Sequence, residues 1–349
     1  MSLALTLALR GLTLLGVLLA VLALVVVSLG ATGFSDRVLN AVIREQLRTE
    51  REVLARTIRD PDQLEQVVAV RKQTLERQHG LDRPWYYRLP DAARRVLTLD
   101  LGEARTLRSA SGSARVSDII LERIPRTLVL VTTATIITAV LGLWLGVKLA
   151  TRVGSRLDRL VSYLSAVSYA VPAWWMGILL ILVLAFYMRV FPSGGMFSAP
   201  PPVGGLRRAL DFAWHALLPV ITLVLVTLGA WVYVVRTMVL NTAQEFFVTV
   251  ARAKGLPEGT VMRRYILRVA APPILTNLVL ALTGSIGGAI LTETVFNWPG
   301  MGRLYYDAIR SADEGVIIAL TFLFTLLYVG ARFLLEVFYV TLDPRVRYS

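Results

Sequence analysis

The chain of 349 residues is rich in apolar side chains and poor in charged ones. Hydrophobic residues make up 55% and charged residues 17% of it, and 37 Lys and Arg against 24 Asp and Glu give a net charge of +13. A soluble domain carries about a quarter charged residues, so this composition excludes disordered, collagen-like and acidic chains and indicates a membrane protein. With no cysteine and two histidines, the sequence also excludes disulfide scaffolds and thiol catalysis, and we expect no bound metal.

Six segments are nearly free of ionisable side chains and are long enough to cross a bilayer. About 20 apolar residues at 1.5 Å per residue span a hydrocarbon layer of about 30 Å. We therefore expect an all-α integral membrane protein with six transmembrane helices, at 11–35, 127–147, 160–188, 212–235, 269–292 and 315–342. The first segment is longer than a secretory signal peptide, so a retained helix is expected there. The last contains Arg332 and Glu336, one helical turn apart, as either a structural ion pair or a transport pair.

The basic side chains of the short loops set the orientation of these helices. With a cytoplasmic N-terminus, thirteen Lys and Arg fall in the inner segments and five in the short outer loops. Because basic residues stay on the cytoplasmic side, we expect a multi-pass protein of the cytoplasmic (inner) membrane with both termini in the cytoplasm. Topology thus accounts for the positive charge, and no nucleic-acid partner is expected.

A long charged stretch at 36–126 separates the first two predicted spans. Apolar residues at helical spacing from Leu39 to Ile58 predict one helix that ends at Asp60-Pro61, and residues 62–78 predict a second. The sequence therefore divides into three parts: an N-terminal transmembrane helix at 1–35, an extracytoplasmic helical subdomain at 36–126 and a core of five helices at 127–349. The subdomain serves either as a solvated cover or as a docking surface for an external partner.

The predicted cytoplasmic loop at 236–268 is the second informative stretch. It breaks at Gly255-Leu256-Pro257 and then resumes helical periodicity. Ala251 and Ala253 keep the surface before the break smooth, and no catalytic group stands beside them. We interpret the loop as a helix, turn and helix that fits a groove of a partner protein; a plain basic loop is the alternative.

Several short motifs occur in an order that resembles one family. Residues Ala251 to Leu256 read ARAKGL and resemble the cytoplasmic "EAA" loop of ABC importer permeases of the peptide/nickel subfamily, which includes the B-type dipeptide and oligopeptide permeases. Further stretches are similar to the pattern of that subfamily: GLDRP at 80–84, DLG at 100–102, VPAWW at 171–175, LPVIT at 218–222, ETVFNWPGMGR at 293–303 and LDPRVRY at 342–348. Each fragment alone is weak, but their order and spacing form a specific signal.

The resemblance implies the fold of a type I ABC importer permease and a subunit that forms half of a translocation pathway. Such a subunit is not itself an enzyme and binds no cofactor, because ATP and Mg²⁺ belong to partner ATPase subunits. The sequence agrees, since it lacks the Gly-x-x-x-x-Gly-Lys-Ser/Thr phosphate loop. The implied partners are a second permease subunit, which would be a paralogue, two cytoplasmic ABC ATPase domains, an extracytoplasmic substrate-binding protein and the lipid bilayer.

The resemblance also assigns coupling to the ATPase to the loop at 245–273. ATP-driven closure of the ATPase pair would move this loop and rock the helices between inward-facing and outward-facing states. The implied coupling residues are Glu245, Thr249, Ala251, Arg252, Ala253, Lys254, Gly255, Leu256, Arg263 and Arg264. The chain departs from the family at Phe246-Phe247, where Asp-Tyr is usual, at Thr249, where the loop motif has Glu, and along residues 34–59.

Broken or polar positions within the helices are candidates for the pathway or its gate. They are Pro172, Ser285 with Gly284, Gly287 and Gly288, Glu293 and Asn297. Glycine in a membrane helix more often serves helix packing than substrate contact.

Other classes of membrane protein fit the sequence less well. An ion-coupled carrier or channel often shows deep ionisable residues or an inverted repeat, and a membrane enzyme needs a catalytic constellation inside a helix. An exporter more commonly has a fused ATPase or lacks the Ala-x-Ala-x-Gly loop. Di- or oligopeptides are the expected substrate, with nickel, glutathione or sugar as alternatives.

Overall fold

The computed structural model describes residues 3–31, 33–56, 58, 60–78, 81–82, 84–88, 94, 98, 100–285, 289–311 and 313–342. This described part is helical apart from turns, loops and one isolated β-bridge, between Glu103 and Arg115. Gly80, Arg83, Gly287, Gly288 and the motif residues 343–348 lie outside the described residues, as does the side chain of Glu336, so the pair with Arg332 stays a prediction.

The chain forms two compact units. One comprises residues 1–119 and 307–329, and the other comprises residues 120–306 and 330–349. The second unit contains the loop that the sequence singles out.

The first unit contains α1 (Leu3–Ala31), α2 (Phe34–Leu54), α3 (Pro61–Gln78), the short 3₁₀ helix η1 (Trp85–Arg88) and the first part of α15 (Glu314–Leu342). Helix α1 carries an apolar stretch at 9–25 and packs against α15 through Leu18, Leu22, Ile318 and Phe322. Burial of these four side chains ties two segments from opposite ends of the sequence together.

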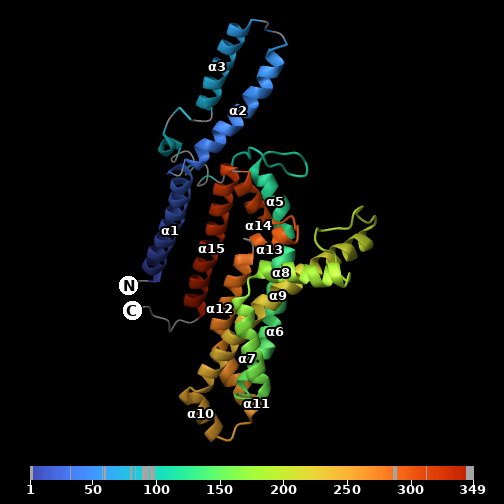
Figure 1. Ribbon diagram of the computed structural model, residues 1–349. Coiled ribbons are helices and arrows are strands. Elements are labelled where there is room, and N and C mark those ends of the chain that lie inside the picture. Colours follow the sequence, from blue (N-terminus) through green and yellow to red (C-terminus); the bar gives the residue numbers. More distant parts are fainter. Residues whose placement is uncertain are drawn as a thin grey trace. The chain divides into compact units, whose positions relative to one another are not determined.

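Helices α2 and α3 lie side by side as an antiparallel hairpin (Figure 1). Ile43 and Leu47 of α2 and Leu75 of α3 form its apolar core. Beside the core, the Arg71 guanidinium donates two hydrogen bonds to the Glu50 carboxylate, at 2.9 and 3.1 Å. The hydrogen bond from Arg71 lowers the pKa of Glu50, so this exposed pair is ionic at neutral pH and loses its charge as the pH falls through that lowered pKa. The two predicted helices are confirmed, although the first ends at Leu54, before Asp60-Pro61.

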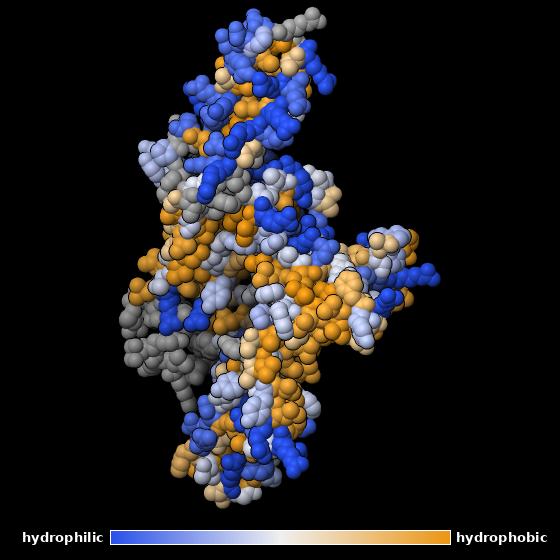
Figure 2. Space-filling view, in the orientation of Figure 1, coloured by the Kyte–Doolittle hydropathy of each residue, from blue (hydrophilic) through white to orange (hydrophobic). Residues whose placement is uncertain are grey.

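The second unit is a bundle of longer helices. Its elements are most of α5 (Val116–Thr127), the π-helical turn η2 (Leu128–Thr132), α6 (Thr133–Ala150), α7 (Arg156–Ala170), α8 (Ala173–Leu180), η3 (Ile181–Tyr187), α9 (Gly205–Ala243), α10 (Phe246–Ala253), α11 (Glu258–Thr260), η4 (Val261–Ile266), α12 (Leu267–Ser285), α13 (Ile290–Val295), the first part of α14 (Met301–Arg310) and the last part of α15. Apolar side chains cover the part of this unit formed by α6, α7 and α9, and charged side chains gather at the end that carries α10 and α11 (Figure 2).

Four helices of the described part are long and apolar enough to cross a membrane, at 116–150, 205–243, 258–285 and 315–335. The pair α7 and α8–η3 makes a fifth if its two pieces are one span. The architecture is therefore that of an all-α membrane protein, as the sequence predicts.

The third predicted span is not one straight helix. It breaks between Ala170 and Ala173, and the two pieces are bent by 100°. Pro172 has no backbone N–H and forces Val171 into an extended conformation, with φ −91° and ψ 121°, so the helix stops there. The fourth predicted span is also longer than expected, because α9 continues through Pro219 to Ala243.

Glycines let three helices of the second unit approach closely. A Cβ atom on Gly142 or Gly146 of α6 would lie 2.9 Å from the Trp231 Cβ atom or 2.7 Å from the Val235 Cγ1 atom of α9. On the α7 side, a Cβ atom on Gly229 of α9 would lie 2.6 Å from the Ser165 Cα atom. Small residues at such crossings replace side-chain interdigitation by direct backbone packing.

We predict that Gly229→Ala destabilises the second unit, because the new methyl group meets α7 backbone that cannot move aside. Overpacking of this kind costs about 1–3 kcal/mol, which corresponds to a lower Tm by several degrees. Thermal unfolding of the purified protein in detergent measures the change. Gly330→Ala in α15 is the matched control, since no atom lies within 4 Å of its added Cβ atom. Equal Tm values for the two variants would contradict the packing argument.

Candidate functional site

Helix α10 lies at one end of the second unit, where the sequence predicts a helix, turn and helix (Figure 1). Its buried face consists of Val248 and Ala251, which are 0% and 2% exposed. These two side chains belong to one apolar cluster with residues of α9, η4 and α12, namely Val235, Val239, Val261, Ile266, Ala270 and Ile274. Helix α10 is therefore attached to the bundle through one face.

The opposite face of α10 is open. Glu245 precedes the helix, and Thr249, Arg252 and Ala253 are exposed along it. The two alanines of the motif therefore differ. Ala253 lies on the open face, whereas Ala251 packs inside the chain, so its small side chain brings α10 close to its own bundle.

The turn after α10 depends on Gly255. Its φ is +74°, and its N–H donates to the Arg252 carbonyl oxygen at 2.9 Å, while the Leu256 N–H donates to the Ala251 carbonyl oxygen at 3.4 Å. These two bonds form a Schellman motif, which needs a left-handed residue at this position. Among the described residues, no atom outside the turn lies within 4 Å of the place where a Cβ atom on Gly255 would stand, and Gly255 itself is exposed.

The basic residues of the loop are exposed, but they are not equivalent. Arg252 reaches across the turn and donates from Nε to Glu258 Oε1 at 2.9 Å and from Nη2 to Oε2 at 3.4 Å. This exposed pair contributes about 0–1 kcal/mol and fixes the turn only weakly. Lys254, Arg263 and Arg264 leave a positive surface around the turn. Of the predicted coupling residues, the structure thus places Glu245, Thr249 and Arg252 to Gly255 on one accessible helix and turn, Ala251 in its buried face, Leu256 half-buried, and Arg263 and Arg264 exposed on η4.

The predicted gate residue Glu293 is buried inside the chain. Its Oε1 atom accepts a hydrogen bond from Thr127 Oγ1 at 3.0 Å, and its Oε2 atom accepts one from the Arg303 N–H at 3.0 Å. Thr127 Oγ1 in turn accepts a hydrogen bond from the Met301 N–H at 2.6 Å. Glu293 and Thr127 therefore satisfy the N–H groups at the start of α14. Gly300 lies against both side chains, and a Cβ atom there would clash with their oxygens.

The other three gate candidates have different surroundings. Ser285 is 2% exposed and shares a hydrogen bond with Thr132 Oγ1 at 2.9 Å. Asn297 is exposed, adopts φ +51° and accepts a hydrogen bond from the Arg303 guanidinium. Pro172 stands at the break between α7 and α8. The continuous helix α5–η2–α6 thus holds Ser285 through Thr132 and Glu293 through Thr127, while Pro172 lies apart from these bonds.

The sequence did not single out the ion pair between α7 and α9. Arg236 Nε lies 2.8 Å from Asp158 Oδ1, and the side chains are 20% and 6% exposed. Ser155 accepts a hydrogen bond from the Asp158 N–H, which makes it the N-cap of α7. Two features of the sequence could have drawn attention to Asp158: the Ser-x-x-Asp spacing of a helix N-cap, and its position as a single acidic residue among basic ones. No local pattern identifies its partner on α9.

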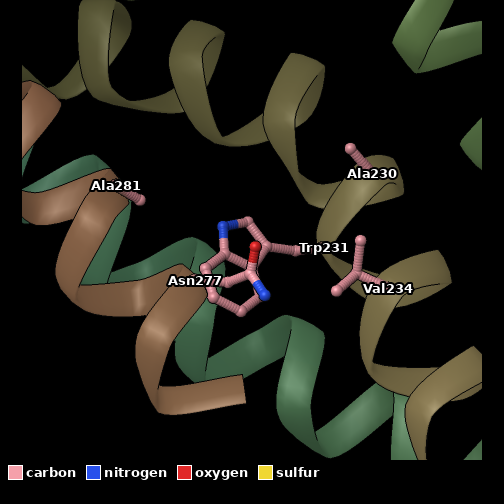
Figure 3. A pocket seen from close by; sticks show the side chains of 5 residues that line it. All are labelled: Ala230, Trp231, Val234, Asn277 and Ala281. Atoms are coloured by element: carbon pink, nitrogen blue, oxygen red, sulfur yellow. The ribbon is translucent and has the colours of Figure 1, made fainter. Parts of the chain in front are cut away.

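A small cavity lies between α9 and α12, beside the cluster that holds α10 (Figure 3). Its volume is about 190 Å³, and Ala230, Trp231 and Val234 of α9 and Asn277 and Ala281 of α12 line it. The Trp231 ring and the Asn277 amide both point into this space (Figure 3). Among the residues that the structure describes, no group of three or more His, Cys, Asp or Glu side chains is arranged to hold a metal ion.

Comparison with known proteins identifies the chain at the level of family. The family described as "Binding-protein-dependent transport system inner membrane component" matches residues 109–348. This match covers most of the second unit, including α10 and its turn.

Curated relatives are similar over most of their length. The oligopeptide transport system permease protein AppB of Bacillus subtilis is 29% identical over 280 residues, which are 80% of this chain and 86% of the relative. The di/tripeptide transport system permease protein DppB of Pseudomonas aeruginosa is 31% identical over 284 residues, 77% of this chain and 83% of the relative. The probable peptide ABC transporter permease protein y4tP of Sinorhizobium fredii is 31% identical over 294 residues, 84% of this chain and 89% of the relative. The chain therefore belongs to the family of binding-protein-dependent transport system inner membrane components and is a membrane-spanning permease subunit of an ABC importer.

Proposed function

We propose that this permease takes up di- or oligopeptides. The observation that carries this proposal is the printed substrate of its relatives, because permeases named for oligopeptides and for di- and tripeptides match about four-fifths of the chain. The apolar helices and the family assignment support a multi-pass subunit that forms half of the translocation pathway.

The exposed helix and turn at 246–260 form the proposed contact with the ATPase. The open face of α10 and the left-handed turn at Gly255 form a small accessible surface, and the buried face of α10 attaches this surface to α9 and α12. Because packed apolar side chains resist compression, a displacement of α10 by the ATPase also displaces the bundle helices that it packs against. The chain itself needs no nucleotide or metal in this scheme, since ATP and Mg²⁺ bind to the ATPase.

The proposed assembly follows from the same topology. Two cytoplasmic ABC ATPase domains contact this chain and a second, paralogous permease, and an extracytoplasmic binding protein delivers the peptide. The chain lies in the cytoplasmic membrane with both termini and the α10 turn in the cytoplasm, as the basic residues of the short loops favour. The extracytoplasmic part comprises residues 36–126, and the core comprises residues 127–349.

We predict that Gly255→Leu uncouples transport from ATP hydrolysis. A left-handed conformation costs an L-residue about 1–2 kcal/mol, so the turn changes shape and its bulk increases where the ATPase binds. The complex reconstituted in proteoliposomes should lose most peptide uptake while the variant chain still inserts into the membrane. Parallel assays of uptake and phosphate release provide the measurement.

Gly112→Leu is the matched control for this experiment. Gly112 has φ +84° and open space around it, so the substitution brings the same backbone strain at a place far along the sequence from α10. Uptake should remain near the wild-type value in this variant. Normal uptake by Gly255→Leu would refute the proposed contact.

We also predict that peptides, rather than other small molecules, drive the complex. The cognate binding protein should bind di- or oligopeptides, and peptide-loaded binding protein should stimulate ATP hydrolysis by the purified complex. Calorimetric titration with peptides, glutathione, nickel and sugars separates the possibilities. If the binding protein binds nickel, glutathione or a sugar tightly and binds no peptide, that compound takes the place of peptide as the proposed substrate.

If the chain purifies without any ATPase and moves ions by itself, it acts as an ion-coupled carrier or channel, and the proposed importer function is wrong.

A further inference from the structure

Among the contacts between helices α7 and α9, two lie in matching antiparallel register. At the first point, Gly229 of α9 lies directly against Ser165 of α7. At the second, Arg236 of α9 donates to Asp158 of α7, with 2.8 Å from Nε to Oδ1 and 3.0 Å from Nη2 to Oδ2. On each helix the two points are seven residues, or about 10 Å, apart.

The space between these two points is not filled by side chains. A cavity of about 500 Å³ opens there between α7 and α9, and Ser162, Ala166 and Tyr233 are among its lining residues. The same stretch of α9 also borders the cavity on the α12 side, because Ala230 and Val234 line both (Figure 3). On the α6 side, by contrast, the glycine contacts of Gly142 and Gly146 pack α9 tightly.

The Asp158–Arg236 pair is rigid and largely removed from water. The Asp158 side chain is 6% exposed and that of Arg236 is 20% exposed. A third donor, the Gly154 N–H, reaches Asp158 Oδ2 at 2.9 Å, so the carboxylate is held from both α9 and the turn before α7. A bidentate guanidinium–carboxylate pair fixes orientation as well as distance. With the close contact at Gly229 alone, α7 could rotate about that contact. The ion pair adds a second contact and so fixes the direction of α7 relative to α9.

The pair also lies next to the attachment of α10. Val235 and Val239, on either side of Arg236 along α9, belong to the buried cluster that contains Val248 and Ala251 of α10. A displacement of α10 therefore reaches Arg236 within one turn of α9.

We infer that Asp158 and Arg236 are positioning residues that transmit the movement of α10 to α7. Helix α7 ends at the break before α8, so the movement passes on to the bent segment at Pro172. Next to the cavity between α7 and α9, the ion pair is a direct, bidentate side-chain connection between the two helices, and we call it the clamp. This inference rests on the proposed coupling role of α10, and its test includes a readout that does not require transport.

The first arm measures the clamp itself. The chain has no cysteine, so Arg156→Cys at the start of α7 and Asn241→Cys near the end of α9 can carry spin labels without other reactive thiols. In the assembled complex the label-to-label distance should show one narrow distribution, both without nucleotide and with bound ATP. Adding Asp158→Asn should broaden or split that distribution, and a distribution that stays narrow would overturn the clamp.

The second arm measures coupling in proteoliposomes. Asp158→Asn and Arg236→Lys should each raise the ATP hydrolysed per peptide transported by about tenfold or more, because an unpaired or singly bonded buried charge no longer fixes α7. Arg159→Gln is the matched control. It removes one unit of charge, of the opposite sign to that removed by Asp158→Asn, from an exposed neighbour on α7, and should leave the ratio within about twofold of wild type, as expected for an exposed charge.

A third variant covers the case in which single variants fail to assemble. The double change Asp158→Leu with Arg236→Met replaces the buried pair by apolar side chains, which commonly preserves stability. It should assemble and hydrolyse ATP but remain poorly coupled; a wild-type ratio would overturn the inference while leaving the proposed function intact. If the wild-type chain instead binds no ATPase and takes up no peptide, the proposed function is overturned. In that case there is also no ATP-driven movement of α10 for the ion pair to transmit.

Discussion

The structure depends on one constraint, which is that a chain in a lipid bilayer must satisfy its backbone N–H and C=O groups internally. Continuous helix does this over most of the second unit. At three of the places where a helix begins or ends, a side chain or a backbone turn takes over. Ser155 caps α7, the Schellman turn at Gly255 closes α10, and Glu293 with Thr127 serves the start of α14. At these three positions, backbone groups outside the regular helices are therefore hydrogen-bonded, as they are inside the helices.

This constraint gives the polar residues of the core two different tasks. From the sequence, Glu293 and Ser285 are predicted candidates for the pathway or its gate. In the structure both are buried and hydrogen-bonded to threonines of the α5–η2–α6 helix. Glu293 and Thr127 fix the start of α14, and Ser285 joins the end of α12 to η2. Within the described part of the chain, exposed polar and charged side chains lie instead along α10 and its turn.

The sequence predicts the membrane class and the order of the helices because charge-free stretches and basic loops are local properties. It also predicts the turn at Gly255, because the glycine and the following proline act on the backbone directly. It was less accurate about the bend within one span, about where a helix ends and about contacts between distant residues. The third span was expected as one helix although Pro172 bends it by 100°, and the fourth was expected to end at Val235 although α9 continues to Ala243. The Asp158–Arg236 pair joins residues 78 apart, and only the antiparallel register of α7 and α9 brings them together.

The left-handed turn at Gly255 has a consequence for how this contact surface can vary. Glycine is achiral, and every other genetically encoded residue carries a side chain of the hand that disfavours φ near +74°. Asparagine is the least unfavourable replacement, because its short polar side chain tolerates this conformation. The handedness of amino acids therefore restricts variation at this position even though the surrounding space is empty, and a D-alanine introduced by chemical synthesis would suit the backbone where L-alanine does not.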